Sequence, residues 1–242
     1  MIKKFFCFIN IVWLIHTLHG EDLPSELKTL GFVEAKAPEP RTKEWDKTAK
    51  LLPYSVEVRK KVLVVKKGKY DYKRDPIIFE AGSHKYIGIN NGEWFGGLYL
   101  NKVDENRAPL FKGNPQYLIK LGDDLYIFEG ITHMGLDQGS IHVIRNYKKN
   151  TKPEKITLLH TSPTLVLLDE KRFVIVGYDS LIMFHPGLAF DIISHGDFWR
   201  SIEPHSIVKY KNHYIIGVRG GLVLAEIGNP TEYKVSYYKS IK

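Results

Sequence analysis

The 242-residue chain contains a single cysteine, Cys7. This scarcity excludes a disulfide framework and any cysteine-rich zinc module. The sequence also has no Gly-x-Ser-x-Gly nucleophile elbow, no phosphate-binding glycine loop and no His-Glu-x-x-His motif. Its other histidine and carboxylate spacings match no metal-binding pattern. We therefore expect no cofactor and no metal, and an enzyme is the less favoured class.

The longest apolar run lies at the N-terminus. Phe5 to Ile15 is almost unbroken, follows Lys3 and Lys4, and leads through Gly20 into acidic residues. This arrangement is typical of a secretory signal, and the run is shorter than the roughly 20 residues of a membrane span. The sequence predicts a signal peptide over residues 1–20 and an exported chain, periplasmic or secreted, without a transmembrane span. An uncleaved N-terminal anchor is the alternative.

The rest of the chain divides into a polar arm and a strand-rich body. Residues 21–55 contain four prolines and two short helical patterns, which predicts an arm or linker. Residues 56–242 consist of β-rich runs separated by polar turns. Four segments there begin with a proline and reach an aromatic residue ten or eleven positions later. The prolines are Pro76, Pro115, Pro163 and Pro204, and the aromatics are Tyr86, Tyr126, Phe173 and Tyr214.

A supersecondary unit repeated at this interval resembles the blades of β-propeller repeat proteins. The resemblance concerns architecture and points to no particular family. It implies an all-β fold, a small β-propeller-like array of four to five blades preceded by the partly helical arm. Runs at 155–159 and 233–238 would supply outer strands, the latter closing the ring by pairing with the first blade. A β-sandwich or an open barrel is the alternative.

Polar residues precede the four prolines and, in a propeller, would enter the innermost strands. They could form a ligand-binding ring at the mouth of the channel. Alternatively, each opens a turn by bonding its own backbone. The members of this predicted ring are Asp75, Asn114, Ser162 and Glu203, with His205 nearby.

A second candidate site lies in a predicted long connection over residues 187–201, because long connections often carry function. Its candidate residues are His195, Asp197, Trp199 and Arg200. An exposed aromatic patch around Trp94, Phe95 or Trp199 would favour a protein partner. Two smaller expectations concern single positions: His142 facing away from the core, and Asp169 lying solvated in a hairpin turn.

Positive charge is concentrated in one window. Residues 59–74 hold eight cationic side chains against one aspartate, whereas the chain after residue 20 carries only +6 in total. The window predicts an anion-binding surface, or an edge strand that its lysines protect from aggregation. The anion-binding candidates are Lys60, Lys61, Lys66, Lys67 and Lys69.

These patterns favour an exported, non-catalytic binding module of the protein-interaction or inhibitor-like kind. The expected partner is another protein, with an anionic glycan or lipid headgroups as further candidates. Nucleic acid does not suit an exported chain. Two alternatives stay open: a glycan-active hydrolase or lyase with its site at the propeller mouth, and a binder of an anionic envelope polymer.

Overall fold

The computed structural model describes residues 22–68, 76–94, 96–103, 108–187, 190–196, 198–228 and 233–241. The predicted signal segment lies outside these residues, as do Asp75, Lys69 and Asp197 of the predicted sites. Strands predominate in the described part of the chain, and none of its helices has the length and apolarity that crossing a bilayer requires.

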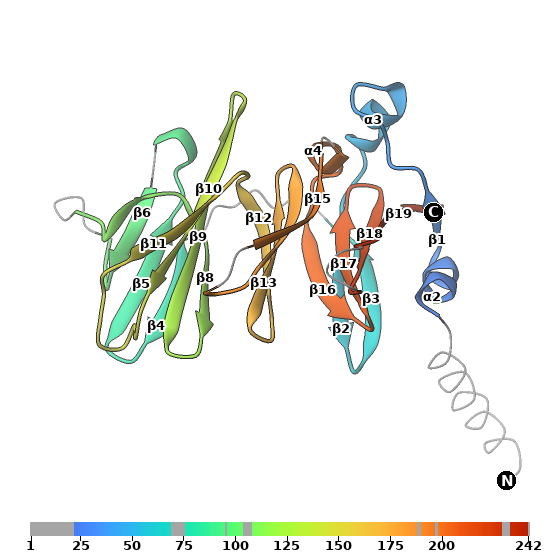
Figure 1. Cartoon of the computed structure of the whole chain (residues 1–242). Helices are drawn as coiled ribbons and strands as arrows, with labels where there is room; N and C mark the ends of the chain where they lie inside the picture. Colours follow the sequence, from blue (N-terminus) through green and yellow to red (C-terminus); the bar gives the residue numbers. More distant parts are fainter. Residues whose placement is uncertain are drawn as a thin grey trace, which may run out of the picture.

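Four antiparallel sheets follow one another along the chain, each with its strands paired in sequence order (Figure 1). Sheet I contains β4 (Ile77–Ala81), β5 (His84–Ile89), β6 (Gly96–Leu100) and β7 (Phe111–Gly113). Sheet II contains β8 (Pro115–Leu121), β9 (Asp124–His133), β10 (Leu136–Ile144) and β11 (Glu154–Leu159). Sheet III contains β12 (Pro163–Asp169), β13 (Arg172–Gly177), β14 (Ser180–Phe184) and β15 (Phe190–His195). Sheet IV contains β16 (Ser206–Tyr210), β17 (His213–Val218), β18 (Gly221–Glu226) and β19 (Val235–Ser240).

The N-terminal arm packs against sheet IV. It contains α2 (Leu23–Leu30), β1 (Phe32–Ala35) and α3 (Lys43–Thr48). Asp22 caps α2 by accepting from the Ser25 N–H at 3.0 Å, and Gly31 ends the helix at φ 91°. The expectation that the last strand pairs with the first blade is wrong, because β19 instead lies between β18 and β1. The described ends of the chain therefore meet in sheet IV (Figure 1).

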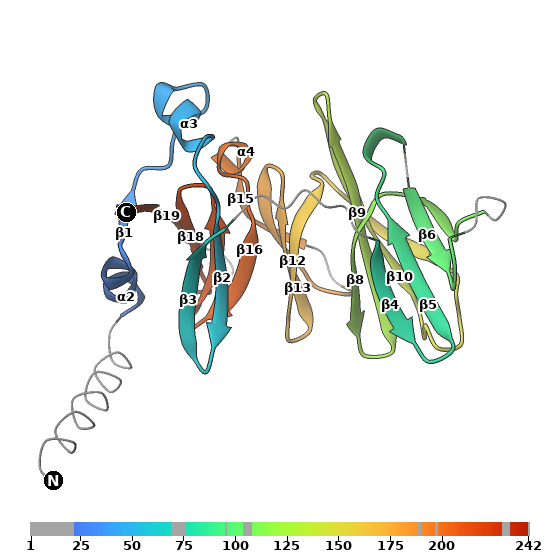
Figure 2. The ribbon, with the colours of Figure 1, turned by 180° about the vertical axis from the view of Figure 1, so that it is seen from behind.

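A hairpin of β2 (Tyr54–Arg59) and β3 (Val62–Lys67) forms a fifth, two-stranded sheet. It contacts β16 and β17 through β2, and the rear view shows it lying over sheet IV (Figure 2). The first strands of successive sheets also contact one another, β4 with β8, β8 with β12 and β12 with β16. The chain is thus an all-β protein of several separate, stacked sheets and not the two-sheet sandwich considered as an alternative.

The four repeated aromatics confirm that the sequence repeat is structural. Tyr86, Tyr126, Phe173 and Tyr214 all open the second strand of their sheets and are at most 3% exposed. Each belongs to an apolar cluster shared with a neighbouring sheet. Because a single sheet cannot bury both of its faces, stacking of the sheets supplies the core.

The predicted long connection is a structured segment. Residues 190–195 form β15, the outer strand of sheet III, and the short helix α4 (Phe198–Ile202) follows it. The expectation of an open loop is wrong because β15 completes sheet III by pairing with β14.

Candidate functional site

A groove of about 540 Å³ lies between α2, the tip of the β2–β3 hairpin and the turn that joins β16 to β17. It brings together three segments that lie far apart in the sequence. The lining residues are Glu26, Thr29 and Leu30 of α2, Val58, Lys61, Val62 and Leu63 of the hairpin, and Lys209, Tyr210 and Lys211.

The floor of the groove is apolar and partly open to solvent. Leu30, Val58, Val62 and Leu63 supply it. Val58 is 39% exposed and Val62 is 45% exposed. The exposed valine surface that lines the groove gains free energy when it is covered.

One end of the groove is neutralised within the chain. Glu26, 7% exposed, accepts hydrogen bonds from the Tyr210 hydroxyl at 3.0 Å and from Lys211 at 2.9 Å. Burial and the adjacent Glu26 carboxylate raise the pKa of Tyr210 to about 12, so its hydroxyl keeps its proton at neutral pH. Lys209 pairs with Asp169 at 2.8 Å. These groups are engaged in holding the wall of the groove.

At the hairpin end of the groove, carboxylates of the described chain pair with only some of the cationic side chains. Glu57 pairs with both Arg59, at 2.9 Å, and Lys66, at 2.7 Å. Within the described part of the chain no carboxylate pairs with Lys60 or Lys61. The predicted basic window therefore places Lys61, which has no carboxylate partner among the described residues, in the lining of the groove.

The turn that carries these lysines has an unfavourable backbone conformation. Lys60 has φ 49° and Lys61 has φ 64°, so both central residues of the two-residue turn lie in the left-handed region. Hairpins normally place Asn-Gly there, because a non-glycine residue costs about 1 kcal/mol or more in this region. Both side chains are exposed, so neither lysine is held at its position by burial.

This strain gives a first prediction. The double substitution Lys60→Asn and Lys61→Gly is expected to raise the free energy of unfolding by about 1–2 kcal/mol, since it relieves the strain. It should also weaken the binding of an acidic ligand in the groove. Urea unfolding measures the change in stability, and titration with an acidic peptide measures the change in binding. Unchanged stability would show that the turn is not strained.

The residues predicted to line the mouth of the channel form hydrogen bonds and ion pairs that hold neighbouring segments in place. Asn114 is 1% exposed, accepts from the amides of Asn91 and Gly96 through its side-chain oxygen, and donates to the Gly92 carbonyl. The amide of Ser162 donates to Asp137 at 2.6 Å. Glu203 pairs with Arg219, while the amide of His205 donates to Gly217. Among the described residues no hydrogen bond or ion pair joins these four positions to one another, and a binding role for them stays a prediction.

The second predicted group gathers around one carboxylate. Asp179 pairs with His195 at 3.6 Å and with Arg200 at 3.2 Å, and Arg200 also lies over the Tyr178 ring. Trp199 is fully buried and its indole N–H donates to Ser194 at 3.3 Å. Trp199 therefore contributes no exposed aromatic surface, since the ring fills the core between sheets III and IV.

Trp94 is the exposed member of the three aromatic residues considered for a partner-binding patch, among those the structure describes. It is 81% exposed in the short helix η1 (Gly92–Trp94), while Phe95 lies outside the described residues. The tip of the β9–β10 hairpin lies against η1, where His133 pairs with Glu93 at 2.7 Å. Met134 at that tip is 92% exposed.

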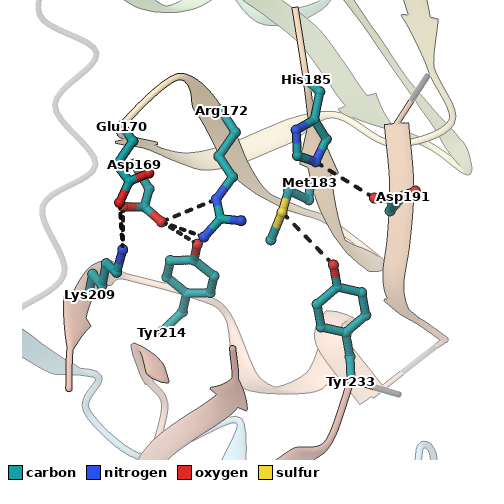
Figure 3. Close-up of polar contacts among 9 residues, drawn as sticks. All are labelled: Asp169, Glu170, Arg172, Met183, His185, Asp191, Lys209, Tyr214 and Tyr233. Carbon is teal, nitrogen blue, oxygen red and sulfur yellow. Dashed lines mark hydrogen bonds and ion pairs between the residues drawn. The ribbon is translucent and has the colours of Figure 1, made fainter. Parts of the chain in front are cut away.

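Two buried polar clusters were missed by sequence reasoning. Asp169, expected to be solvated, is 6% exposed and accepts from Lys209, Arg172 and Tyr214 between sheets III and IV (Figure 3). His142, expected to face outward, is 8% exposed and stacks on Phe111 of sheet I with ring centres 4.6 Å apart. In both cases a neighbouring sheet covers a position that is exposed within its own sheet.

No protein-family model matches the chain, and no curated protein matches it. Among solved structures, the N-terminal domain of Nup159 is similar at 11% identity with a TM-score of 0.35. The match covers 87% of this chain and 64% of that domain. A likeness at this level carries no argument about fold or function.

Proposed function

We propose that the chain is an exported, non-catalytic protein-binding module, built as a propeller-like array of four to five blades, and that the groove is its binding site. The juxtaposition of Lys61 with Val62 carries the proposal. A cation without a described partner stands next to an exposed apolar floor, and such a surface complements an acidic segment that also carries apolar side chains.

The chemistry of the lining argues against catalysis in the groove. Its one carboxylate, Glu26, is bonded to Tyr210 and Lys211. The lining residues that the structure describes include no second carboxylate for acid–base work on a glycosidic bond and no serine or cysteine nucleophile. Recognition is what these residues can perform.

The apolar floor also favours a protein segment over a polyanionic polymer. A glycan polyanion would engage the lysines and leave Val58 and Val62 in water. Covering both valines contributes through the hydrophobic effect only if the ligand has apolar side chains of its own.

The proposal is tested with a fluorescent acidic peptide of about eight residues, valine and threonine in its centre and glutamates at its ends. Charge reversal by Lys60→Glu and Lys61→Glu is expected to weaken its binding about tenfold, or about 1.4 kcal/mol. Fluorescence anisotropy at low and moderate salt measures both affinities.

A matched control is the double reversal Lys148→Glu and Lys149→Glu, which changes an exposed lysine pair far from the groove. It should leave the affinity within about twofold of the original, because distant exposed charges are screened. Equal losses in the two variants would overturn the proposal. The proposal would also be overturned if the chain bound no peptide but was retained on heparin through Lys60 and Lys61. That result would assign the site to an anionic polymer.

A further inference from the structure

The hairpin sheet has fewer strands than its neighbours. In the described part of the chain, sheets I to III have four strands and sheet IV has five with β1, whereas β2 pairs only with β3. Because β2 faces β16, the strand at the outer edge of the hairpin sheet is β3 (Figure 2). The groove borders this strand, since Lys61, Val62 and Leu63 all line it.

The pairing register identifies the backbone groups at the open edge. Arg59 pairs with Val62 across the two-residue turn, so this is a hydrogen-bonded pair and the N–H and C=O groups of Val62 point toward β2. By alternation, the backbone groups of Leu63, Val65 and Lys67 point outward. A backbone hydrogen bond from Leu63 reaches the Tyr210 hydroxyl at one end of this edge. Along the rest of this outer edge, no strand of the described chain pairs with β3.

The edge has few of the features by which proteins block strand addition. The register of β2 with β3 is regular, without a bulge, and β3 contains no proline. Its first four residues, Val62 to Val65, are apolar, and Val62 is 45% exposed. Lysines are confined to the two ends, with Lys60 and Lys61 before the strand and Lys66 and Lys67 closing it.

The positions of the lysines indicate which kind of strand could pair with the outer edge of β3. If a second copy of the chain added its own β3 in antiparallel register, Lys60 and Lys61 of one copy would lie near Lys66 and Lys67 of the other. Like charges at both ends would oppose this pairing, whereas carboxylates at both ends of a partner strand would favour it.

We propose that the groove takes up an extended segment of a partner protein as an added strand on β3, apolar in its centre and carrying Asp or Glu at both ends. The inference rests on the proposed function and specifies its binding mode. Main-chain hydrogen bonds to Val65 and Lys67 supply affinity, and side-chain contacts with the groove supply specificity.

N-methylation of the acidic peptide tests the mode without altering the protein. A strand added along one edge uses the amides of alternate residues only. One peptide is therefore methylated at the odd-numbered amides and its isomer at the even-numbered amides. One isomer is expected to lose at least about tenfold in affinity, while the other stays within about twofold of the parent peptide.

The outcomes separate the two proposals. If the parent peptide binds and both isomers bind equally well, strand addition is wrong while the groove remains the binding site. If both isomers lose binding equally, the alternation that an added strand requires is absent and the inference is again wrong. Failure of the parent peptide itself overturns the proposed function together with the inference. Formation of a β3-to-β3 dimer by the unsubstituted chain, which the Lys60→Glu and Lys61→Glu reversal should strengthen, would assign the edge to a second copy and overturn the acidic partner.

Discussion

Replacing Asp169 with asparagine is expected to lower the free energy of unfolding by about 3 kcal/mol. The carboxylate is 6% exposed and accepts from the Tyr214 hydroxyl at 2.6 Å, from Lys209 at 2.8 Å and from Arg172 at 3.0 Å. Burial by itself would raise the pKa of Asp169, but these three hydrogen bonds outweigh it and hold the pKa below its ordinary value. The ionised form is thus the one the fold requires.

The loss is large because the asparagine would leave two cations without their shared counter-charge. Arg172 starts β13 in sheet III, whereas Lys209 and Tyr214 belong to β16 and β17 in sheet IV (Figure 3). The carboxylate therefore joins the two sheets, and removing its charge weakens their contact. An asparagine side chain can accept through only one oxygen, so at least one of the three donors loses its partner.

Glu170 provides the matched control one residue away. Its side chain is 79% exposed and lies 3.7 Å from the same lysine. Glu170→Gln should change the free energy of unfolding by less than about 0.5 kcal/mol, because exposed ion pairs contribute little. Urea unfolding followed by both fluorescence and circular dichroism measures the two variants. Similar small effects of both substitutions would show that Asp169 does not join the sheets.

The sequence predicted the repeat well because the repeat is encoded locally. In each sheet a proline lies at or just before the start of the first strand, a polar turn follows that strand, and a buried aromatic lies near the start of the second strand, as at Tyr86 and Phe173. These signals need no knowledge of distant segments. The strand β15 was missed because it is an outer strand with little apolar alternation, and its Ile192 is 51% exposed.

The candidate site was predictable only in part, since it depends on distant contacts. The sequence showed the basic window and its strand, and in the structure Lys61 lines a groove, while an anion-binding role for the window stays a prediction. The groove itself needs α2 and the turn after β16, which local patterns cannot bring together. Asp169 and His142 escaped prediction for the same reason, because burial of both comes from a neighbouring sheet.

Acidification from pH 7 to pH 4 is expected to destabilise the native chain by about 3 kcal/mol through His142 alone. Burial, with a smaller contribution from the charge of Lys155, lowers the pKa of His142 from 6.5 to about 4. The ring stacks on Phe111, its Nε2 lies 2.8 Å from the Ser140 hydroxyl, and the Glu129 carboxylate lies 4.0 Å away. As pH falls below about 6.5, the unfolded chain binds a proton that the native imidazole does not accept, so stability is lost down to about pH 4.

Comparison of His142→Gln with the unsubstituted chain isolates this contribution. Glutamine can still bond to Ser140 but does not titrate, so the variant should lose clearly less stability between pH 7 and pH 4 in urea unfolding. The exposed histidine at position 195, with a side chain that is 63% accessible, serves as the control. His195→Gln should keep the pH dependence of the unsubstituted chain, because it leaves the buried His142 ring unchanged. An unchanged slope in His142→Gln would show that the buried ring accepts its proton without cost, and that sheet I does not shield it from water.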